Sequence, residues 1–232
     1  SFTYDCGDFP KVLNMALQAA DYTGFKERRL KSEQKQKIRG LGVANPIEIA
    51  AGPDHSPNPE YASVTIKTNG TLEVLVGSQD SGQGHYTAFI QLLSDHLGYD
   101  PESIKIFTGD TKRIVQGVGT FGSRTIASAG TSLLDTVEKI VEQLAPMAAE
   151  RLGVRKNELQ YREGIWTCRC LNRNNSHITL KEVQKMLKED LTAETFCRAN
   201  GATFPNACHV CEVEIDPETG EITFDRYVVA ED

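Results

Sequence analysis

Two glycine-rich turns constrain the fold of this chain more than any other feature, because each comes directly before a segment with helical apolar spacing. The first runs Gly77-Ser-Gln-Asp-Ser-Gly-Gln-Gly-His, and the second runs Gly117-Val-Gly-Thr-Phe-Gly-Ser-Arg-Thr. The first N–H groups of a helix have no intrahelical partner, and such groups bind phosphate well. We therefore expect one phosphate-bearing ligand held from both sides, with the turns at 81–85 and 119–125 converging on a shared hollow.

The segments around these turns contain both strands and helices. Strands over 61–67 and 71–76 are joined by Asn69-Gly70, a strong hairpin signal. After the first turn, a helix begins near Gln83 and ends at Gly98, and a strand follows over 103–108. The second turn leads into a long helix that Pro146 should kink or break.

The flanking regions complete an α+β fold. Asp8 is a suitable N-cap for a helix over 9–20, and a buried strand interrupted near Pro46 covers 40–52. The other expected elements are a hairpin turning at Glu163-Gly164, a helix over 180–188, and strands over 194–199, 207–215 and 221–229. Because strands and helices do not alternate strictly, we predict helices packed on a mixed, largely antiparallel sheet as a two-layer sandwich. Residues 1–232 then form part of one domain, with possible subdomains 1–153 and 154–232.

Charge and hydropathy exclude several kinds of partner. The 232 residues include 25 basic and 32 acidic side chains, a net charge of −7, and no basic stripe interleaved with aromatic residues, so nucleic acid is not an expected partner. The basic run over 26–39 predicts a solvated helix followed by a linker. No stretch approaches the ~20 apolar residues that span a bilayer, so we expect no membrane contact and a soluble, cytoplasmic protein. The chain starts at Ser1 and stops within an apparent strand, which suggests a piece cut at both ends.

Six cysteines, at positions 6, 168, 170, 197, 208 and 211, raise the question of a zinc site. Cys168-x-Cys170 and Cys208-x-x-Cys211 could form one. However, residues 208–215 alternate like a half-buried strand, which places Cys208 and Cys211 on opposite faces. We therefore expect buried, reduced thiols, and no four-cysteine iron–sulfur spacing is present.

Taken singly, the residues of the two turns leave several interpretations open. Thr87 stands where a dinucleotide fingerprint needs its third glycine, and no Gly-Lys-Ser/Thr sequence follows. The glycines of either turn could merely permit a positive φ. His85 is a capping or core group, or alternatively a base. Arg124, beside Ser123 and Thr125, could bind a phosphate with its fork of donors, or could form a surface ion pair.

The motifs taken together resemble one family. The chain contains Gly77-Ser-Gln-Asp-Ser-Gly-Gln-Gly-His-Tyr-Thr-Ala-Phe, then Leu97-Gly-Tyr-Asp-Pro-Glu-Ser-Ile-Lys-Ile, then Gly109-Asp-Thr, then the second turn. Their order and spacing resemble the molybdenum-cofactor subunit of the xanthine dehydrogenase, aldehyde oxidase and carbon monoxide dehydrogenase family. The resemblance runs from Tyr4-Asp-Cys-Gly-Asp-Phe through Arg39-Gly-Leu-Gly-Val to His209-Val-Cys-Glu-Val-Glu, and only 154–206 is indistinct.

This resemblance implies a molybdopterin cofactor, in bacterial relatives commonly the cytosine dinucleotide form. Carried over by motif, the first loop would lie near the pterin, and the second would line the pyrophosphate and nucleotide. The cofactor-binding residues implied are Gln83, Gly84 and His85 in the first loop, and Thr120, Phe121, Gly122, Ser123, Arg124 and Thr125 in the second.

The resemblance also implies an oxidoreductase reaction and partners. Members oxidise or hydroxylate a small organic substrate with oxygen from water, and they pass electrons to iron–sulfur and flavin subunits or domains. The glutamate base lies in a Gly-Glu motif that is absent here, since Glu163 and Glu221 fall in expected hairpins. We expect the chain to bind part of the cofactor and to contain no catalytic residue and no metal ligand. It would be a fragment or split subunit that docks on the remaining segments of the molybdenum subunit. The alternatives are a non-catalytic scaffold of the same fold that binds no cofactor alone, and a nucleotide-binding enzyme of another family.

Overall fold

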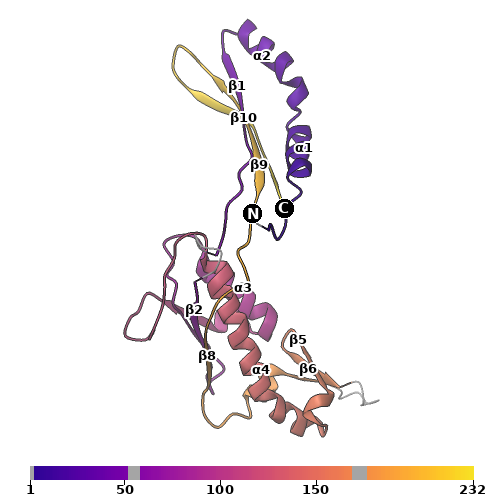
Figure 1. Ribbon diagram of the computed structural model, residues 1–232, viewed down its shortest axis with the longest axis vertical. Helices are drawn as coiled ribbons and strands as arrows, with labels where there is room; N and C mark the ends of the chain where they lie inside the picture. The colour runs from indigo at the N-terminus through magenta and orange to yellow at the C-terminus, as the bar shows by residue number, and fades with distance from the viewer. Residues whose placement is uncertain (1–2, 52–57, 169–176) are drawn as a thin grey trace. The chain divides into compact units, whose positions relative to one another are not determined.

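The computed structural model describes residues 3–51, 58–168 and 177–232. Contacts divide the chain into two compact units, one made of Ser1–Ala50 with Thr203–Asp232 and the other of Ala51–Ala202 (Figure 1). The boundaries therefore fall near residues 50 and 202, whereas the sequence suggested a division at residue 153. Within the described part of the chain, no helix combines the length and hydropathy that a bilayer crossing requires.

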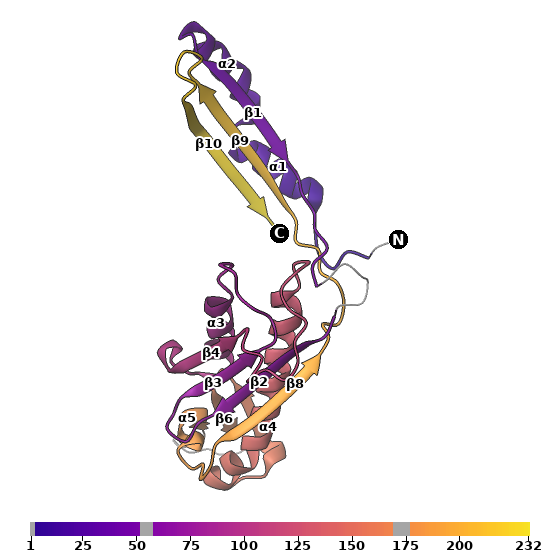
Figure 2. The same ribbon diagram turned by 90° about the vertical axis from the view of Figure 1, so that its left-hand side faces the viewer.

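The first unit is a three-stranded antiparallel sheet in the order β1-β9-β10, with helices on one face (Figure 2). Asp8 caps the first helix as expected, since its Oδ1 accepts a hydrogen bond from the Lys11 amide at 3.1 Å. Small buried residues of this helix, Val12 and Ala16, pack against Cys208 and Val210 of β9. The elements are α1 (Phe9–Ala19), η1 (Tyr22–Gly24), α2 (Phe25–Gln34), β1 (Ile38–Ala44), β9 (Ala207–Ile215) and β10 (Ile222–Glu231).

The basic run contains the expected exposed helix, α2, but only residues 35–37 link it to β1, which begins at Ile38. Two arginines of the basic run converge on Glu212, whose side chain is 1% exposed. Arg28 Nη2 lies 2.7 Å from Glu212 Oε2, and Arg39 Nη1 lies 2.6 Å from Oε1. Sequence patterning shows the positive charges but not the carboxylate on a strand far along the chain that pairs with them.

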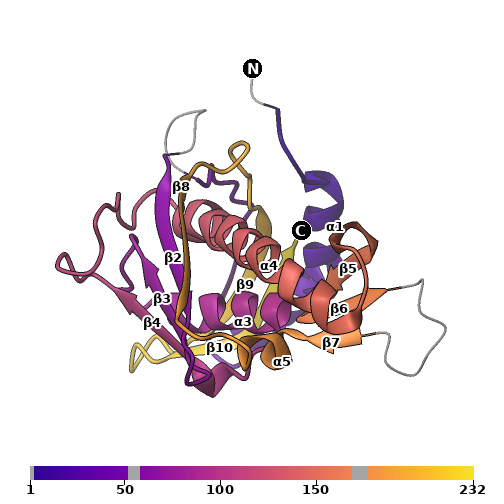
Figure 3. The ribbon, with the colours of Figure 1, turned by 90° about the horizontal axis from the view of Figure 1, so that it is seen from below.

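The second unit is built on a four-stranded sheet in the order β4-β3-β2-β8. The strand pairs of this sheet are mixed: β2 is antiparallel to β3 and to β8, while β3 is parallel to β4. Two helices, α3 and α4, lie side by side on one face of the sheet (Figure 3). The elements are β2 (Glu60–Ile66), β3 (Leu72–Val76), α3 (His85–Leu97), η2 (Pro101–Ser103), β4 (Ile104–Thr108), the π-helix η3 (Thr125–Gly130), α4 (Thr131–Leu152) and β8 (Leu191–Cys197). The α+β prediction of helices on a mixed, largely antiparallel sheet is confirmed.

The core of this unit lies between the sheet and the two helices. Val64 and Val74 of the sheet and Phe89, Leu93 and Leu133 of the helices have no solvent exposure. The local signals that predicted these elements hold: the hairpin turns at 69–70, and Gly98 ends α3 in the left-handed conformation.

The long helix α4 runs unbroken through Pro146, so the expected break is absent. A proline inside a helix costs about 3 kcal/mol, and burial of the apolar face of α4 against β2 and β8 offsets that loss. Beyond α4 lies a small antiparallel sheet, β5-β6-β7, whose first hairpin turns at Glu163 and Gly164 as predicted. Its elements are η4 (Lys156–Glu158), β5 (Leu159–Arg162), β6 (Ile165–Cys168), β7 (His177–Thr179) and α5 (Leu180–Gln184).

Candidate functional site

The two glycine-rich loops start at the same edge of the four-stranded sheet. One follows β3 and the other follows β4, and these strands are parallel, with Val76 paired to Thr108. The carboxyl ends of parallel strands share an edge, which is where open α/β sheets bind their ligands. The strand–loop–helix–strand order that the sequence predicted is thus what brings the loops together.

The two glycine-rich turns contact each other near their amino-terminal ends, at residues 77–79 and 117–120. Thr120 Oγ1 donates a hydrogen bond to the Gln79 carbonyl oxygen at 2.6 Å. The backbones cross at two glycines, since a Cβ placed on Gly77 would lie 2.8 Å from the Cα of Gly117. A side chain at either position would force the loops apart, so glycine is required here for close approach.

A buried glutamate, Glu60, lies beneath this crossing. It is the first residue of β2, which runs antiparallel to β3, so it lies at the edge where the loops start. Its side chain has no solvent exposure. Its Oε2 accepts from Ser78 Oγ at 2.9 Å and from the Gly119 amide at 3.2 Å, and its Oε1 accepts from the Val118 amide at 3.1 Å. Both loops are therefore tied to one carboxylate.

Arg124 completes this arrangement from the second loop. Its Nη1 donates to Glu60 Oε2 at 2.6 Å and also to the Gly119 carbonyl oxygen. Its Nη2 donates to the carbonyl oxygens of Asn58 and Pro59, at 3.1 and 2.8 Å. These bonds use both Nη atoms, Nε is buried without a partner among the described residues, and a phosphate contact by Arg124 stays a prediction. With an exposure of 0%, the guanidinium does not form the surface ion pair that was the alternative. It forms a buried ion pair under the loops.

The surroundings of Glu60 lower the pKa of its carboxyl group. Burial alone raises the pKa of Glu60, but the hydrogen bonds from Arg124, the Tyr61 and Val118 amides and Ser78 outweigh burial and hold the pKa below its ordinary value. The carboxylate is therefore ionised at neutral pH. The buried pair carries no net charge, so the sign of the potential at the loops depends on backbone dipoles and exposed groups.

The tip of the first loop is organised by its own side chains. Asp80 Oδ1 accepts from the Gly82 and Gln83 amides at 3.0 and 2.9 Å, and Gln83 Oε1 accepts from the Ser81 amide at 2.6 Å. Gly82 and Gly84 have φ values of +99° and +77°, with open space where a Cβ would project. Helix α3 begins directly afterwards without a side-chain cap, so its first N–H groups have no capping partner from a side chain.

His85, the first residue of α3, is a buried side chain, as the core interpretation predicted. It is 8% exposed and lies against Phe89, with ring centroids 6.0 Å apart. Its Nδ1 is 3.8 Å from Asp80 Oδ1 and has no hydrogen-bond partner among the described residues. A buried nitrogen without a partner at a helix start is a group that a ligand atom can satisfy.

The tip of the second loop presents a short exposed segment. Phe121 is 44% exposed, and Gly122 and Ser123 are also exposed, with φ values of +54° and +51°. Thr125 is buried, and its Oγ1 lies 3.0 Å from that of Thr120. The nine predicted residues thus divide into exposed tips (Gln83, Gly84, Phe121, Gly122, Ser123), buried supports (His85, Arg124, Thr125) and Thr120 at the contact between loops.

Sequence reasoning missed the residues that join the loops, namely Glu60, Gln79 and the glycine pair 77/117. Gln79 and the two glycines lie within the motifs, but the close approach of the two loops could not be predicted without the parallel pairing of β3 and β4. Glu60 follows Asn58 and Pro59 at a loop boundary, where nothing in the local pattern indicates burial.

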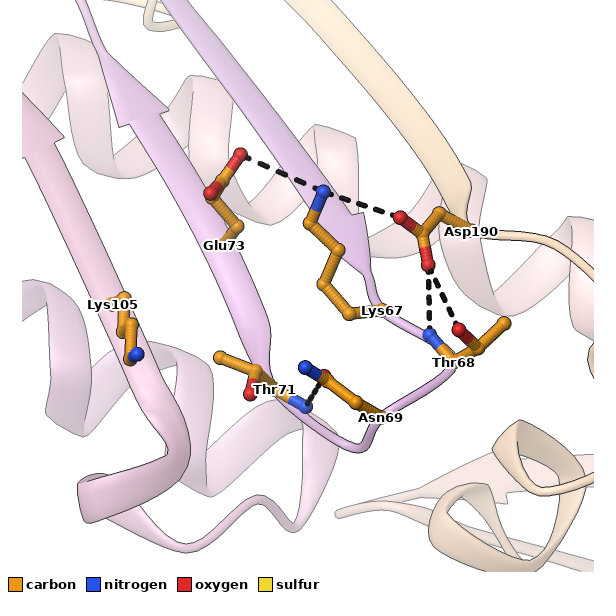
Figure 4. Close-up of a pocket in the computed structure, with 7 residues that line it drawn as sticks. All are labelled: Lys67, Thr68, Asn69, Thr71, Glu73, Lys105 and Asp190. Atoms are coloured by element: carbon orange, nitrogen blue, oxygen red, sulfur yellow. Dashed lines mark hydrogen bonds and ion pairs between the residues drawn. The ribbon is translucent and has the colours of Figure 1, made fainter.

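A separate pocket of about 350 Å³ lies at the opposite end of the same sheet (Figure 4). It is lined by charged and polar side chains that largely pair with one another. Lys67 Nζ lies 3.2 Å from Asp190 Oδ2 and 3.9 Å from Glu73 Oε1. Since it adjoins the amino ends of β3 and β4, it shares no residue with the loops.

The cysteines do not assemble into a metal site among the described residues, where no group of three or more potential ligands lies together. Cys208 is buried and Cys211 is half-buried on β9. Cys170 lies outside the described residues. Cys168 is disulfide-bonded, so the expectation of reduced thiols is wrong for this residue.

Comparisons with known proteins show which family this chain resembles. The family model described as "Molybdopterin cofactor-binding domain" matches residues 15–232. The chain is 26% identical to the carbon monoxide dehydrogenase large chain of Hydrogenophaga pseudoflava, over 100% of this chain and 31% of that protein. It is 27% identical to subunit gamma of the 6-hydroxypseudooxynicotine dehydrogenase complex of Paenarthrobacter nicotinovorans, over 94% of this chain and 28% of that subunit.

Solved structures show the same fold. Reconstituted CO dehydrogenase from Oligotropha carboxidovorans superposes with a TM-score of 0.81 and 25% identity, covering 99% of this chain and 31% of that one. Quinoline 2-oxidoreductase from Pseudomonas putida 86 also reaches 0.81, at 21% identity over 97% of this chain and 31% of that one. This chain spans about a third of the length of such relatives. It belongs to the molybdopterin cofactor-binding domain family.

Proposed function

We propose that this chain binds the molybdopterin cofactor of a molybdenum hydroxylase through the two joined loops, as a fragment or split subunit of the whole enzyme. The observation that carries the proposal is that both loops lie at one sheet edge, held by a common buried anchor, with an uncapped helix start beside them. Relatives with this domain are named as dehydrogenase or hydroxylase chains, which supports a redox role.

The residues present fit a ligand that carries a pyrophosphate. The exposed glycines 82 and 84 leave open space at the start of α3, and no residue that the structure describes is a hydrogen-bond partner of His85 Nδ1. Backbone N–H groups at a helix start bind phosphate oxygens without a positive side chain. The two Nη atoms of Arg124 donate to Glu60 and to carbonyl groups, so in this proposal Arg124 supports the loop and does not contact the ligand.

Within this proposal the chain's own residues bind and orient the cofactor. Gln83, Gly84 and the α3 amides hold the end nearest the pterin, and Phe121, Gly122 and Ser123 line the nucleotide end. The cytosine dinucleotide form is the variant proposed, since the matched relatives include carbon monoxide dehydrogenase. When bound, the cofactor supplies oxidation of a small organic substrate with oxygen drawn from water. The glutamate base and the substrate pocket belong to the rest of the enzyme.

The proposal includes partners and a cytoplasmic location. The partners are the remaining segments of the molybdenum subunit together with iron–sulfur and flavin subunits. Apolar side chains on the outer face of the β1-β9-β10 sheet support docking: Phe224 is 69% exposed and Tyr227 is 58% exposed. Side chains of this kind commonly lie under a protein partner.

Metal and pterin analysis of the purified protein, co-expressed with the proteins encoded beside it, tests the proposal. We expect molybdenum and pterin in stoichiometric amounts in the wild-type complex. Gly122→Val should lower both, because a β-branched residue disfavours the φ of +54° at the loop tip. Gly70→Val is the matched control, since it places the same strain in the hairpin turn at the other end of the sheet, where φ is +91°. A complete complex with neither molybdenum nor pterin would exclude cofactor binding and favour a scaffold.

A further inference from the structure

The two loops have no side chain between them where they cross, so something else must set their spacing. Gly77 and Gly117 are in backbone contact, and a Cβ on Gly77 would lie 2.2 Å from Glu60 Oε1. The Glu60 carboxylate therefore lies directly under the crossing.

We propose that Glu60 is a positioning residue that sets the distance between the two loops and the direction of the Val118 and Gly119 amides of the second loop. This inference rests on the proposed function only for the identity of the ligand, because the loop geometry itself does not depend on it. Glu60 accepts a hydrogen bond from Ser78 Oγ of the first loop and from the Val118 and Gly119 amides of the second. Because Glu60 is the first residue of β2, its backbone is held in the sheet, and both loops are hydrogen-bonded to this one fixed residue.

Both carboxylate oxygens are needed for this role. Oε1 accepts from the Tyr61 and Val118 amides, and Oε2 accepts from Ser78, Gly119 and Arg124. A glutamine side chain has one accepting oxygen and one NH₂ donor. In Glu60→Gln, at least one of the two loop amides must therefore face a donor and lose its acceptor.

A purely structural role for Glu60 is the competing explanation. In that case its function is only to neutralise the buried guanidinium of Arg124, and removing both charges should restore the wild-type loop. In the positioning role, removing both charges restores overall stability but leaves at least one of the two loop amides without an acceptor. The double variant Glu60→Gln/Arg124→Gln separates these explanations, because it contains no unpaired buried charge.

Hydrogen exchange of the full chain, resolved to single amides, is the measurement. We expect the Val118 or Gly119 amide, or both, to exchange at least about tenfold faster in Glu60→Gln and in the double variant than in the wild type, since a hydrogen bond to a charged acceptor is lost. Amides in the middle of β3 should keep wild-type protection in the double variant. If Glu60→Gln alone does not fold, the double variant gives the same comparison. Wild-type exchange at both amides in the double variant overturns the positioning role.

A matched control is available in the other unit. Glu212→Gln makes the same change at another buried carboxylate paired with arginine. It should leave exchange at Val118 and Gly119 unchanged, and equal acceleration by Glu212→Gln would overturn the proposal. Absence of pterin from the wild-type complex would count against the proposed function while leaving this exchange result intact, so the two failures are distinguishable.

Discussion

The Nη1 atom of Arg124 lies 2.6 Å from Glu60 Oε2, and neither side chain is exposed to solvent. Removing one member of a buried ion pair leaves an uncompensated charge in a site that water does not reach. A substitution at Arg124 therefore removes the buried ion pair that holds the second loop, and its effect on stability must be measured before any loss of ligand binding is assigned to a lost contact.

Arg124→Ala should lower the free energy of unfolding by about 3–5 kcal/mol, because Glu60 would remain buried without its partner. Urea denaturation followed by circular dichroism measures this change. Arg29→Ala is the control, since Arg29 forms an exposed pair with Glu33 and its loss should cost about 0.5 kcal/mol or less. Equal effects of the two substitutions would contradict the buried pair.

Stability should fall on acidification. The pKa values of Glu60 and Glu212 are held below their ordinary value, for Glu212 mainly by the hydrogen bond from Arg28, then by Arg39 against the opposing effect of burial. A carboxyl with a lower pKa in the folded state contributes stability that is complete above the unfolded-state pKa of about 4.3 and is lost as pH falls through the folded-state pKa. Urea midpoints measured from about pH 7 to about pH 3 should therefore decrease below about pH 5. Midpoints that stay level or rise over this range would contradict the pKa directions.

Gly117→Ala should destabilise the chain by about 1–3 kcal/mol, because the added methyl group overlaps fixed backbone. The new Cβ would lie 2.6 Å from the Gly77 carbonyl oxygen. Gly201→Ala is the control, as no atom lies within 4 Å of its Cβ position. Thermal unfolding of both variants gives the comparison, and the loop crossing is disproved if they melt together.

Gln83→Ala should reduce cofactor content with little effect on stability. The side chain is exposed and accepts a hydrogen bond from the Ser81 amide, so its loss loosens the tip of the first loop and removes a polar contact of the proposed ligand. Molybdenum analysis should show a drop of about threefold or more, while the unfolding free energy changes by about 0.5 kcal/mol or less. Gln18→Ala, at an exposed position of α1, should change neither quantity.

Local signals explain what the sequence predicted well. Helix α3 has apolar residues at helical spacing and Gly98 at its end, and the hairpin at Asn69-Gly70 has a turn that needs a positive φ. Each of these features is decided by residues close to one another in the chain. The same holds for the Asp8 cap of α1 and for the alternation in β9.

Non-local pairings explain what the sequence could not reveal. Glu60 and Arg124 are 64 residues apart, and Arg28 and Glu212 are 184 apart. The sequence around Arg124, with Ser123 and Thr125 beside it, suggests a phosphate site, and only the fold shows that both Nη atoms already donate to Glu60 and to carbonyl groups. At Pro146 the sequence predicts a kink or a break, and a break is absent for a related reason, because packing on the sheet outweighs a local preference.

The separation of a buried anchor from exposed loop tips has an evolutionary consequence. Residues such as Gln83 and Phe121 are exposed, so a substitution there leaves no buried charge and is restricted only by contact with the ligand. Glu60 and Arg124 have no such freedom, since a chain that keeps only one of them carries a lone buried charge. Substitutions at positions 60 and 124 should therefore arise in pairs across lineages, while the tips diverge one residue at a time.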